Sequence, residues 1–352
     1  MKQVLIVKGI VMPKCNKVFN SLILSSAIAL LSACGGGGGG NGGGSTSVVT
    51  ASAPVTVTAA NAPDVAGATF DATDDLSGGG GGVTGVFAAS AGGTQSADIN
   101  VLDALVAQIR RAPGLLGSSA SGVGPAAVVQ INSEPCDSGT FSGSFNDADN
   151  DQNLSTGDSL SVTSNSCSFD GVVMNGSLTV DNVVVTGGFI NDIAPYSFSF
   201  RIRTSNFSVT ADGETVAMDG DITLQESTDD NVTFTTTFSG NGIQIVTGVD
   251  TLILTDFTID EIENEASGAY TLSMNGTISS SSIGGSVIVT TNVAFTGVGV
   301  SEPTGGEASC VGANGTSVRL IANVDGNTVQ LQVDTNGDGT ADNTIDETWV
   351  NL

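Results

Sequence analysis

The chain has 352 residues, with 36 acidic and nine cationic side chains, no histidine and a formal net charge of −27 at pH 7. So negative a protein repels phosphate backbones, which argues against nucleic acid as a partner and against charge-driven docking on anionic lipid. Without histidine, Ser-His-Asp triads and imidazole-ligated zinc sites are excluded. Carboxylate chemistry, or a binding role without catalysis, remains.

The first segment predicts export. Residues 21–33 form an apolar run after Lys14 and Lys17, shorter than the roughly 20 residues that a membrane-spanning helix needs. The run ends at Leu31-Ser32-Ala33-Cys34, which resembles the lipobox of bacterial lipoproteins. An ordinary secretory signal followed by an incidental cysteine is the alternative.

The lipobox resemblance implies that residues 1–33 are a signal peptide and that Cys34 becomes a mature N-terminus carrying three acyl chains. Several chains make a membrane anchor effectively permanent. Such proteins commonly carry Asp after the cysteine when they stay at the inner membrane, so Gly35 implies the outer membrane. The leader is long for this class, and Met12 offers a second start. Residues 34–47 then form a glycine-rich tether.

Residues 48–127 are rich in Ala, Gly and Ser, and we expect a loosely structured region with one strand around 55–59. A short helix is predicted at about 100–111, where Asn100 can cap the start and Pro113 follows the end. One apolar face and two terminal arginines support it: Leu102, Leu105, Val106, Ile109, Arg110 and Arg111.

From residue 128 to 352 the hydrophobic period changes to two, in segments rich in Thr, Val and Phe. The connections are too short for crossover helices, so the strands should be antiparallel. The predicted fold class is therefore all-β: an antiparallel meander closed into a barrel or folded into a sandwich, with one short N-terminal helix.

One phrase is repeated in this β region: Met174-Asn175-Gly176, Met218-Asp219-Gly220 and Met274-Asn275-Gly276. Asn-Gly and Asp-Gly between alternating segments are the strongest short hairpin signal. We therefore expect hairpin turns with methionine packed beside them, and a row of thioether ligands is the alternative.

Three cysteines remain after the predicted anchor. Cys136 and Cys167 bracket an acidic stretch, and a disulfide between them would fix that stretch between two strands. Cys310 is then left as a small buried side chain or as the partner of another chain, and a different pairing that uses Cys310 is also open.

The acidic stretch has the ligand spacing of a twelve-residue calcium loop: Asp147, Asp149, Asp151, Asn153, Ser155 and Asp158 occupy positions 1, 3, 5, 7, 9 and 12. Leu154 stands at the eighth, inward-facing position. The loop resembles those of dockerins and other EF-hand-type modules, which implies calcium. It departs from them at Gln152, where they usually have Gly, and a strand follows it where an EF-hand has a helix.

A second candidate lies near the C-terminus. Asp334, Asn336, Asp338, Thr340 and Asp342 fit positions 1, 3, 5, 7 and 9 of the same spacing, with Ile345 at the twelfth. A solvated turn without an ion is the alternative for both loops. With the affinities of extracellular modules, about 10⁻⁴–10⁻³ M, bound calcium would be structural.

These features predict a non-enzymatic lipoprotein of the outer membrane, anchored through Cys34, that meets a glycan or protein partner at the cell surface or serves the envelope. Two alternatives are a periplasm-facing carrier of an apolar ligand and a carboxylate-dependent hydrolase. The hydrolase would need two carboxylates about 5–10 Å apart in a cleft.

Overall fold

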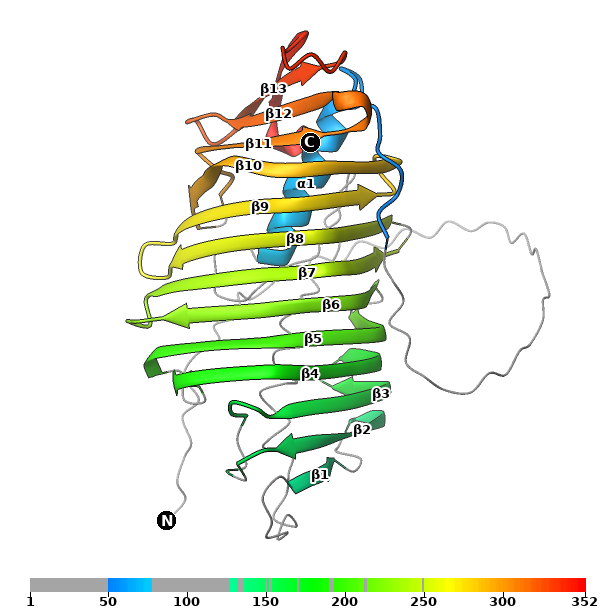
Figure 1. The fold of residues 1–352 in the computed structure, drawn as a ribbon, viewed down its shortest axis with the longest axis vertical. Helices are drawn as coiled ribbons and strands as arrows, with labels where there is room; N and C mark the ends of the chain where they lie inside the picture. Colours follow the sequence, from blue (N-terminus) through cyan, green and yellow to red (C-terminus); the bar gives the residue numbers. More distant parts are fainter. Residues whose placement is uncertain are drawn as a thin grey trace, which may run out of the picture. The chain divides into compact units, whose positions relative to one another are not determined.

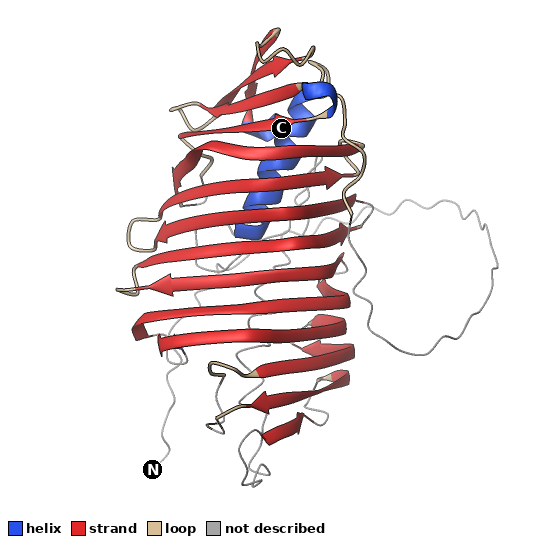
Figure 2. Ribbon diagram, viewed as in Figure 1, coloured by secondary structure: helices blue, strands red, loops and turns tan. Residues whose placement is uncertain are grey.

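The alternating segments form one antiparallel sheet in the computed structural model (Figure 1). The structure describes residues 50–77, 127–131, 136–149, 151, 154–169, 171–189, 193–211, 214–248, 250–299 and 301–352. Fourteen strands pair in chain order, each with the next, and Figure 2 shows how strands dominate the described part. The all-β antiparallel meander is confirmed.

From residue 127 onward, the elements follow one another with short connections. They are α1 (Ala62–Ser77), β1 (Ala127–Ile131), β2 (Ser138–Asp147), β3 (Ser159–Phe169), β4 (Val172–Gly188), β5 (Ile193–Ala211), β6 (Glu214–Thr228), β7 (Thr233–Thr247), β8 (Asp250–Asn264), β9 (Ala269–Ser280), β10 (Gly285–Val298), β11 (Gly305–Val311), η3 (Ala313–Gly315), β12 (Ser317–Ala322), β13 (Thr328–Asp334), β14 (Asn343–Thr348) and η4 (Trp349–Asn351).

The expected closure into a barrel or a sandwich is wrong. Strands β1 and β14 stand at opposite ends of the strand order, so the described strands form one open sheet and not a closed ring or two separate sheets. Each hairpin adds its strand to the same sheet, and closure would require the first and last strands to pair. The terminal strand β14 carries Asp346 and Glu347, and charge on an edge strand discourages further pairing.

One face of the sheet is apolar and buried, and we call it the inner face. Along β5, Phe198, Phe200 and Ile202 are buried, while Ser199 and Arg201 between them point to the opposite, outer face. Neighbouring strands add further inner-face side chains, among them Phe145, Leu160, Leu178, Leu224, Phe238, Ile259, Leu272 and Val289. The core of the protein is therefore built on one side of the sheet.

Helix α1 covers part of this inner face and contacts β7 to β9 and β11 to β13 (Figure 2). It lies in the region that we expected to be loosely structured, and the helix predicted at 100–111 lies outside the described residues. Val65, Ala66 and Thr69 form its buried side. Before the helix, residues 55–59 do not form the expected strand. This part of the chain makes a single isolated β-bridge, between Pro54 and Ser286.

The C-terminus closes over α1. The rings of Phe70 and Trp349 have centroids 4.5 Å apart, and both rings contact Phe295. A Cβ on Gly67 would lie 2.3 Å from the Leu352 carbonyl oxygen, so only glycine lets the last residue approach the helix this closely. The helix thereby ties the two ends of the described chain together.

The repeated Met-Asx-Gly phrase is not a set of hairpin turns. It lies inside β4, β6 and β9, opposite irregularities of the strand pairing where Ser166, Asn206 and Asp256 have positive φ. Positive φ suits bulges as well as turns, which is why the two patterns look alike in sequence.

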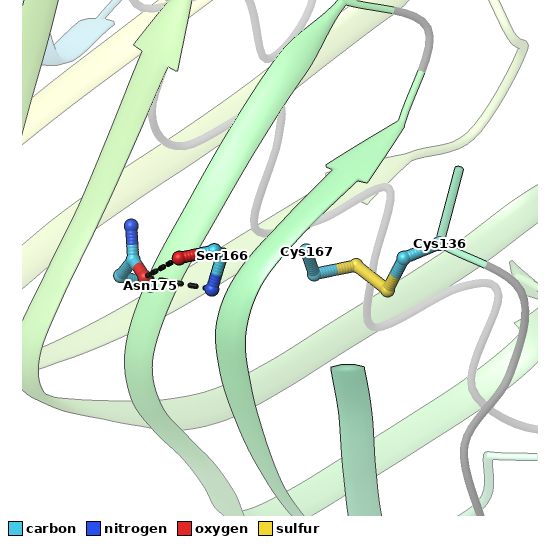
Figure 3. The surroundings of a disulfide bond; sticks show 4 residues. All are labelled: Cys136, Ser166, Cys167 and Asn175. Atoms are coloured by element: carbon cyan, nitrogen blue, oxygen red, sulfur yellow. Dashed lines mark hydrogen bonds between the residues drawn. A yellow bond between two sulfur atoms is a disulfide. The ribbon is translucent and has the colours of Figure 1, made fainter. Parts of the chain in front are cut away.

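The phrase holds two of these bulges through its Asx side chain. Asn175 Oδ1 accepts a 2.7 Å hydrogen bond from the Ser166 amide (Figure 3), and Asp219 Oδ1 accepts one from the Asn206 amide. In β5 the bulge adds one residue, so the inner-face side chains fall on even residue numbers before it and on odd numbers after it. Ile202 before the bulge and Phe207 after it are therefore both buried. Met174, Met218 and Met274 are buried in the core.

The outer face is mostly polar, with a few exposed aliphatic side chains, and the arginines on it in the described residues are paired. Arg201 Nε donates to Asp181 Oδ1 at 2.7 Å, Arg203 contacts the other oxygen of Asp181, and Arg201 also lies 3.7 Å from Asp221. The hydrogen bond from Arg201, with the nearby Arg203 charge, lowers the pKa of Asp181 below its usual range.

We predict that Gly176→Ala destabilises the protein more than Gly171→Ala. Both glycines have positive φ, which costs alanine about 1 kcal/mol. Only at position 176 would the new Cβ also meet a backbone atom, the Asn206 carbonyl oxygen at 2.0 Å, whereas position 171 is open. Urea unfolding followed by circular dichroism measures both variants. Equal losses of stability would contradict the bulge assignment.

We also predict that Asp181→Asn lowers the melting temperature at pH 7 by a few degrees or less, as expected for a partly exposed ion pair. Because the folded pKa of Asp181 is lowered, its stabilisation is present above pH about 4 and is lost as pH falls through the folded pKa. The wild-type and variant melting curves should therefore converge in acid. A difference in melting temperature between wild type and Asp181→Asn that persists at pH 2 would refute this. So would an equal difference at pH 7 for the control Asp229→Asn, which changes an exposed acid.

Candidate metal centre

The predicted disulfide is present between Cys136 and Cys167, with Cα atoms 5.2 Å apart (Figure 3). Cys136 lies just before β2 and Cys167 lies on β3, and the Asp137 amide donates to the Ser168 carbonyl beside them at 2.8 Å. The bond thus fixes the open end of the β2–β3 hairpin, whose closed end is the acidic stretch. For a loop of 31 residues, the chain-entropy model gives a stabilisation of about 3–4 kcal/mol.

Of the roles left open for Cys310, the structure shows the first, a small buried side chain. It is a free, fully buried cysteine on β11, with its sulfur 3.3 Å from Thr69 Oγ1 on α1. Burial raises the pKa of its thiol to about 11, with only a small opposing effect from Thr69. It behaves as a small core side chain and not as an accessible thiol.

The first acidic loop is anchored by two buried carboxylates. Asp147 is the last residue of β2 and Asp158 directly precedes β3, and each is 1% exposed. Asp158 accepts hydrogen bonds from the amides of Ala148 at 2.7 Å and Ser155 at 2.5 Å. Burial raises the pKa of Asp158 above its usual value, against the lowering by these hydrogen bonds, and the Asp147 charge adds to the increase.

Three carboxylates of this loop converge. Asp147, Asp149 and Asp151 each offer an oxygen, and these oxygens lie within 4.8 Å of one another. The Asp151 amide donates to Asp147 Oδ1 at 3.2 Å and to Asp149 Oδ1 at 3.3 Å, which curls the chain around the three groups. Carboxylate oxygens are the hard donors that calcium and magnesium prefer. This trio could therefore hold a divalent cation.

The remaining predicted ligands of the loop behave differently. Ser155 Oγ donates to Asp149 Oδ2 at 3.1 Å and so braces the trio. The Asp158 carboxylate faces backbone amides, and Asn153 lies outside the described residues. The structure thus brings together the residues at the first, third and fifth positions of the predicted loop. The residue at the twelfth position, Asp158, instead accepts hydrogen bonds from amides at both ends of the loop.

The second half of the loop rests on β4, a contact that the calcium spacing did not predict. Thr156 Oγ1 donates to the Val185 carbonyl at 3.0 Å and accepts from the Val185 amide at 2.9 Å. The Gly157 amide donates to the Val183 carbonyl at 2.9 Å, and Leu154 is buried, as its position in the spacing suggested. These contacts fix the loop before any ion binds.

The second acidic loop has a different arrangement. Asp334, the last residue of β13, is buried and accepts from the amides of Gly337 and Gly339, both at 2.7 Å, while Asp342 accepts from Thr335. Burial raises the pKa of Asp334, but these amides outweigh it and lower the pKa overall; the Thr335 hydrogen bonds lower that of Asp342.

The other predicted ligands of the second loop also serve its backbone. Asn336 Oδ1 accepts from the Asp338 amide at 2.9 Å, and Asp338 Oδ1 accepts from the Thr340 amide at 2.8 Å. Among the described residues, the close trio of carboxylates is found in the first loop and not here. The first loop is therefore the stronger candidate metal centre.

Comparisons with known proteins add no relative. No protein-family model matches the chain, and neither a curated protein nor a solved structure resembles it significantly. Within the described part of the chain, no helix is both long enough and apolar enough to span a membrane.

Proposed function

We propose that the chain is a non-enzymatic lipoprotein of the bacterial outer membrane, anchored through Cys34 and presenting its sheet to a glycan or protein partner. The Cys136–Cys167 disulfide is the observation that carries this proposal. Structural disulfides form in oxidising compartments outside the cytoplasm. The bond therefore supports the export that the lipobox-like Leu31–Cys34 segment implies.

The proposal includes calcium as a structural ion in the first acidic loop. Its support is the convergence of Asp147, Asp149 and Asp151 on a loop that the disulfide hairpin and β4 already hold in place. Like charges so close together repel, and a divalent cation between them would offset that repulsion. Bound calcium would then connect β2 to β3 more firmly at the end of the hairpin opposite the disulfide.

The outer face is the surface we propose for partner contact. Its exposed positions are mostly hydroxyl side chains, such as Thr163 and Ser177, whose oxygens lie 3.2 Å apart across neighbouring strands. Hydroxyl groups both donate and accept hydrogen bonds, which suits the polar surfaces of glycans and proteins.

The two alternatives fit less well. A carrier needs an apolar inner face, which this sheet has, but Phe145 and Phe200 are at most 1% exposed there, so a ligand would have to displace the present core. A hydrolase needs two accessible carboxylates about 5–10 Å apart in a cleft, and the neighbouring inner-face glutamates Glu226 and Glu261 are too buried to serve as such a pair.

The anchor is tested by metabolic labelling with radioactive palmitate in a bacterial host. We predict that the wild-type chain and the control Cys15→Ser are labelled and sediment with outer membranes, whereas Cys34→Ser is unlabelled and is released. Label on the Cys34→Ser variant, or an unlabelled wild type, would rule out lipidation at this residue.

The ion is tested by thermal unfolding of the mature chain in calcium, in magnesium and in chelator. We predict a calcium-specific rise of several degrees in the melting temperature, because an ion that binds only the folded state stabilises it. Asp149→Asn with Asp151→Asn should remove the rise, since both side chains are exposed and their loss leaves the core intact. The control Asp229→Asn should keep it. The same melting temperature with millimolar calcium and with chelator would show that the loop is a solvated turn.

A further inference from the structure

The tripeptide Asn-X-Ser/Thr, which accepts N-linked glycans on the surface of exported proteins, recurs along the chain. It begins at Asn153, Asn175, Asn206, Asn231, Asn275 and Asn314. A sequence with so many Asn, Ser and Thr residues contains the tripeptide by chance. The place of each asparagine in the fold therefore decides which of them can serve as an acceptor.

The transfer reaction sets the structural requirement. The side-chain amide nitrogen of asparagine attacks the anomeric carbon of a sugar carried on a lipid pyrophosphate. A C–N bond forms, the C–O bond to the pyrophosphate breaks, and the amide proton passes to a carboxylate of the transferase. The enzyme must hold both the asparagine and the hydroxyl two residues later. A segment hydrogen-bonded to strands on both sides cannot enter such a cleft without losing those bonds.

Three of the asparagines lie inside long strands that have a neighbour on each side: Asn175 on β4, Asn206 on β5 and Asn275 on β9. Asn175 pairs with Ser208 and holds the bulge at Ser166 through its side chain. Asn206 forms the bulge that Asp219 holds, and Asn275 pairs with Thr258 of β8. These positions serve the sheet and are closed to a transferase.

Asn314 lies on the short helix η3 and is exposed, but the hydroxyl of its tripeptide is not accessible. Thr316 is 3% exposed, accepts a 2.9 Å hydrogen bond from the Val57 amide and donates to the Ala313 carbonyl at 2.8 Å. The hydroxyl is thus committed to the core packing of this end. Asn153 lies outside the described residues.

Asn231 differs from these because it lies on the turn between β6 and β7, at the end of the long strands (Figure 1). The residue is exposed and has a φ of 56°. Asp230 Oδ1 accepts from the amides of Val232 at 2.8 Å and Thr233 at 2.7 Å, so residues of the turn itself maintain its shape. The turn presents its asparagine to solvent beyond the strand ladder.

The hydroxyl and the flanking acid of this tripeptide are also well placed. Thr233 is the first residue of β7, and its hydroxyl accepts from Asn264 Nδ2 at 3.2 Å, which leaves it able to donate. The end of a strand opens more readily than its middle. Asp229, two residues before Asn231, is exposed. Bacterial oligosaccharyltransferases select an acid at that place, where the other described tripeptides have an uncharged residue.

We propose that Asn231 is the acceptor of an N-linked glycan, transferred from a lipid-pyrophosphate-linked oligosaccharide to its side-chain amide nitrogen. In the cell this step rests on the proposed export, because the transfer takes place outside the cytoplasm. The glycan extends from the β6–β7 turn into solvent, so the modification leaves the buried inner face unchanged.

The test uses the purified, folded mature chain, so that its outcome does not depend on export. The chain is incubated with a bacterial oligosaccharyltransferase and an undecaprenyl-pyrophosphate-linked oligosaccharide of known mass, and modified residues are mapped by mass spectrometry. We expect one oligosaccharide on Asn231 and at least about tenfold less modification of Asn175, Asn206 and Asn275, since their strands open rarely. A peptide of residues 225–237 shows whether the enzyme accepts the sequence without the fold.

Three variants separate the acceptor from general effects on stability. Asn231→Gln and Thr233→Val should abolish modification at the turn and Thr233→Ser should retain it, while each melts within a few degrees of wild type, as surface changes do. An unmodified folded chain would overturn the proposal, whether or not the peptide is modified. Equal modification of the strand asparagines, or a glycan that persists on Asn231 in Thr233→Val, would overturn it as well.

Discussion

Burial of one face of an open sheet is the constraint on which the rest of the structure depends. A closed barrel covers its own interior, but this sheet ends at β1 and β14, so other parts of the chain must cover the inner face. Helix α1 and the C-terminal turn at Trp349 do this for the later strands. The apolar residues of the long strands would otherwise form a large exposed patch, and such a patch leads to association.

A face can be buried only if every strand keeps its alternation. A slip of one residue would turn the inner side chains outward, and strands of up to 19 residues accumulate such errors easily. The bulges at Ser166 and Asn206 add one residue each, and the Asx side chains of the neighbouring strands hold them. The Met-Asx-Gly repeat therefore helps to keep the strands in register. The correct register also keeps the polar side chains, including the paired arginines, on the outer face.

The strands were largely predictable from sequence because the period of two follows directly from the pleat. The bulges were not, because Ser205-Asn206 and Gly240-Asn241-Gly242 have the composition of turns although they lie inside β5 and β7. Helix α1 was missed because its Ala- and Asp-rich sequence has a weak apolar face. The open edges could not be predicted, since pairing between the first and last strands leaves no local signal.

The candidate site shows the same division. The spacing of Asp147, Asp149 and Asp151 predicted their convergence, since a tight loop turns alternate side chains inward. The same spacing predicted Asp158 as a ligand, but its carboxylate contacts loop amides, a geometry that depends on where β3 begins. In the second loop, the glycines at 337 and 339 bring amides to Asp334, so a similar spacing yields a self-satisfied turn.

Hydrogen exchange of the mature chain, resolved by mass spectrometry, tests most directly whether the whole inner face is one covered core. Full covering predicts strong amide protection in β4 to β6, which α1 does not contact extensively, comparable with that in β8 and β9 beneath the helix. Rapid exchange in β4 to β6, with protection confined to the strands under α1, would contradict this account of the fold.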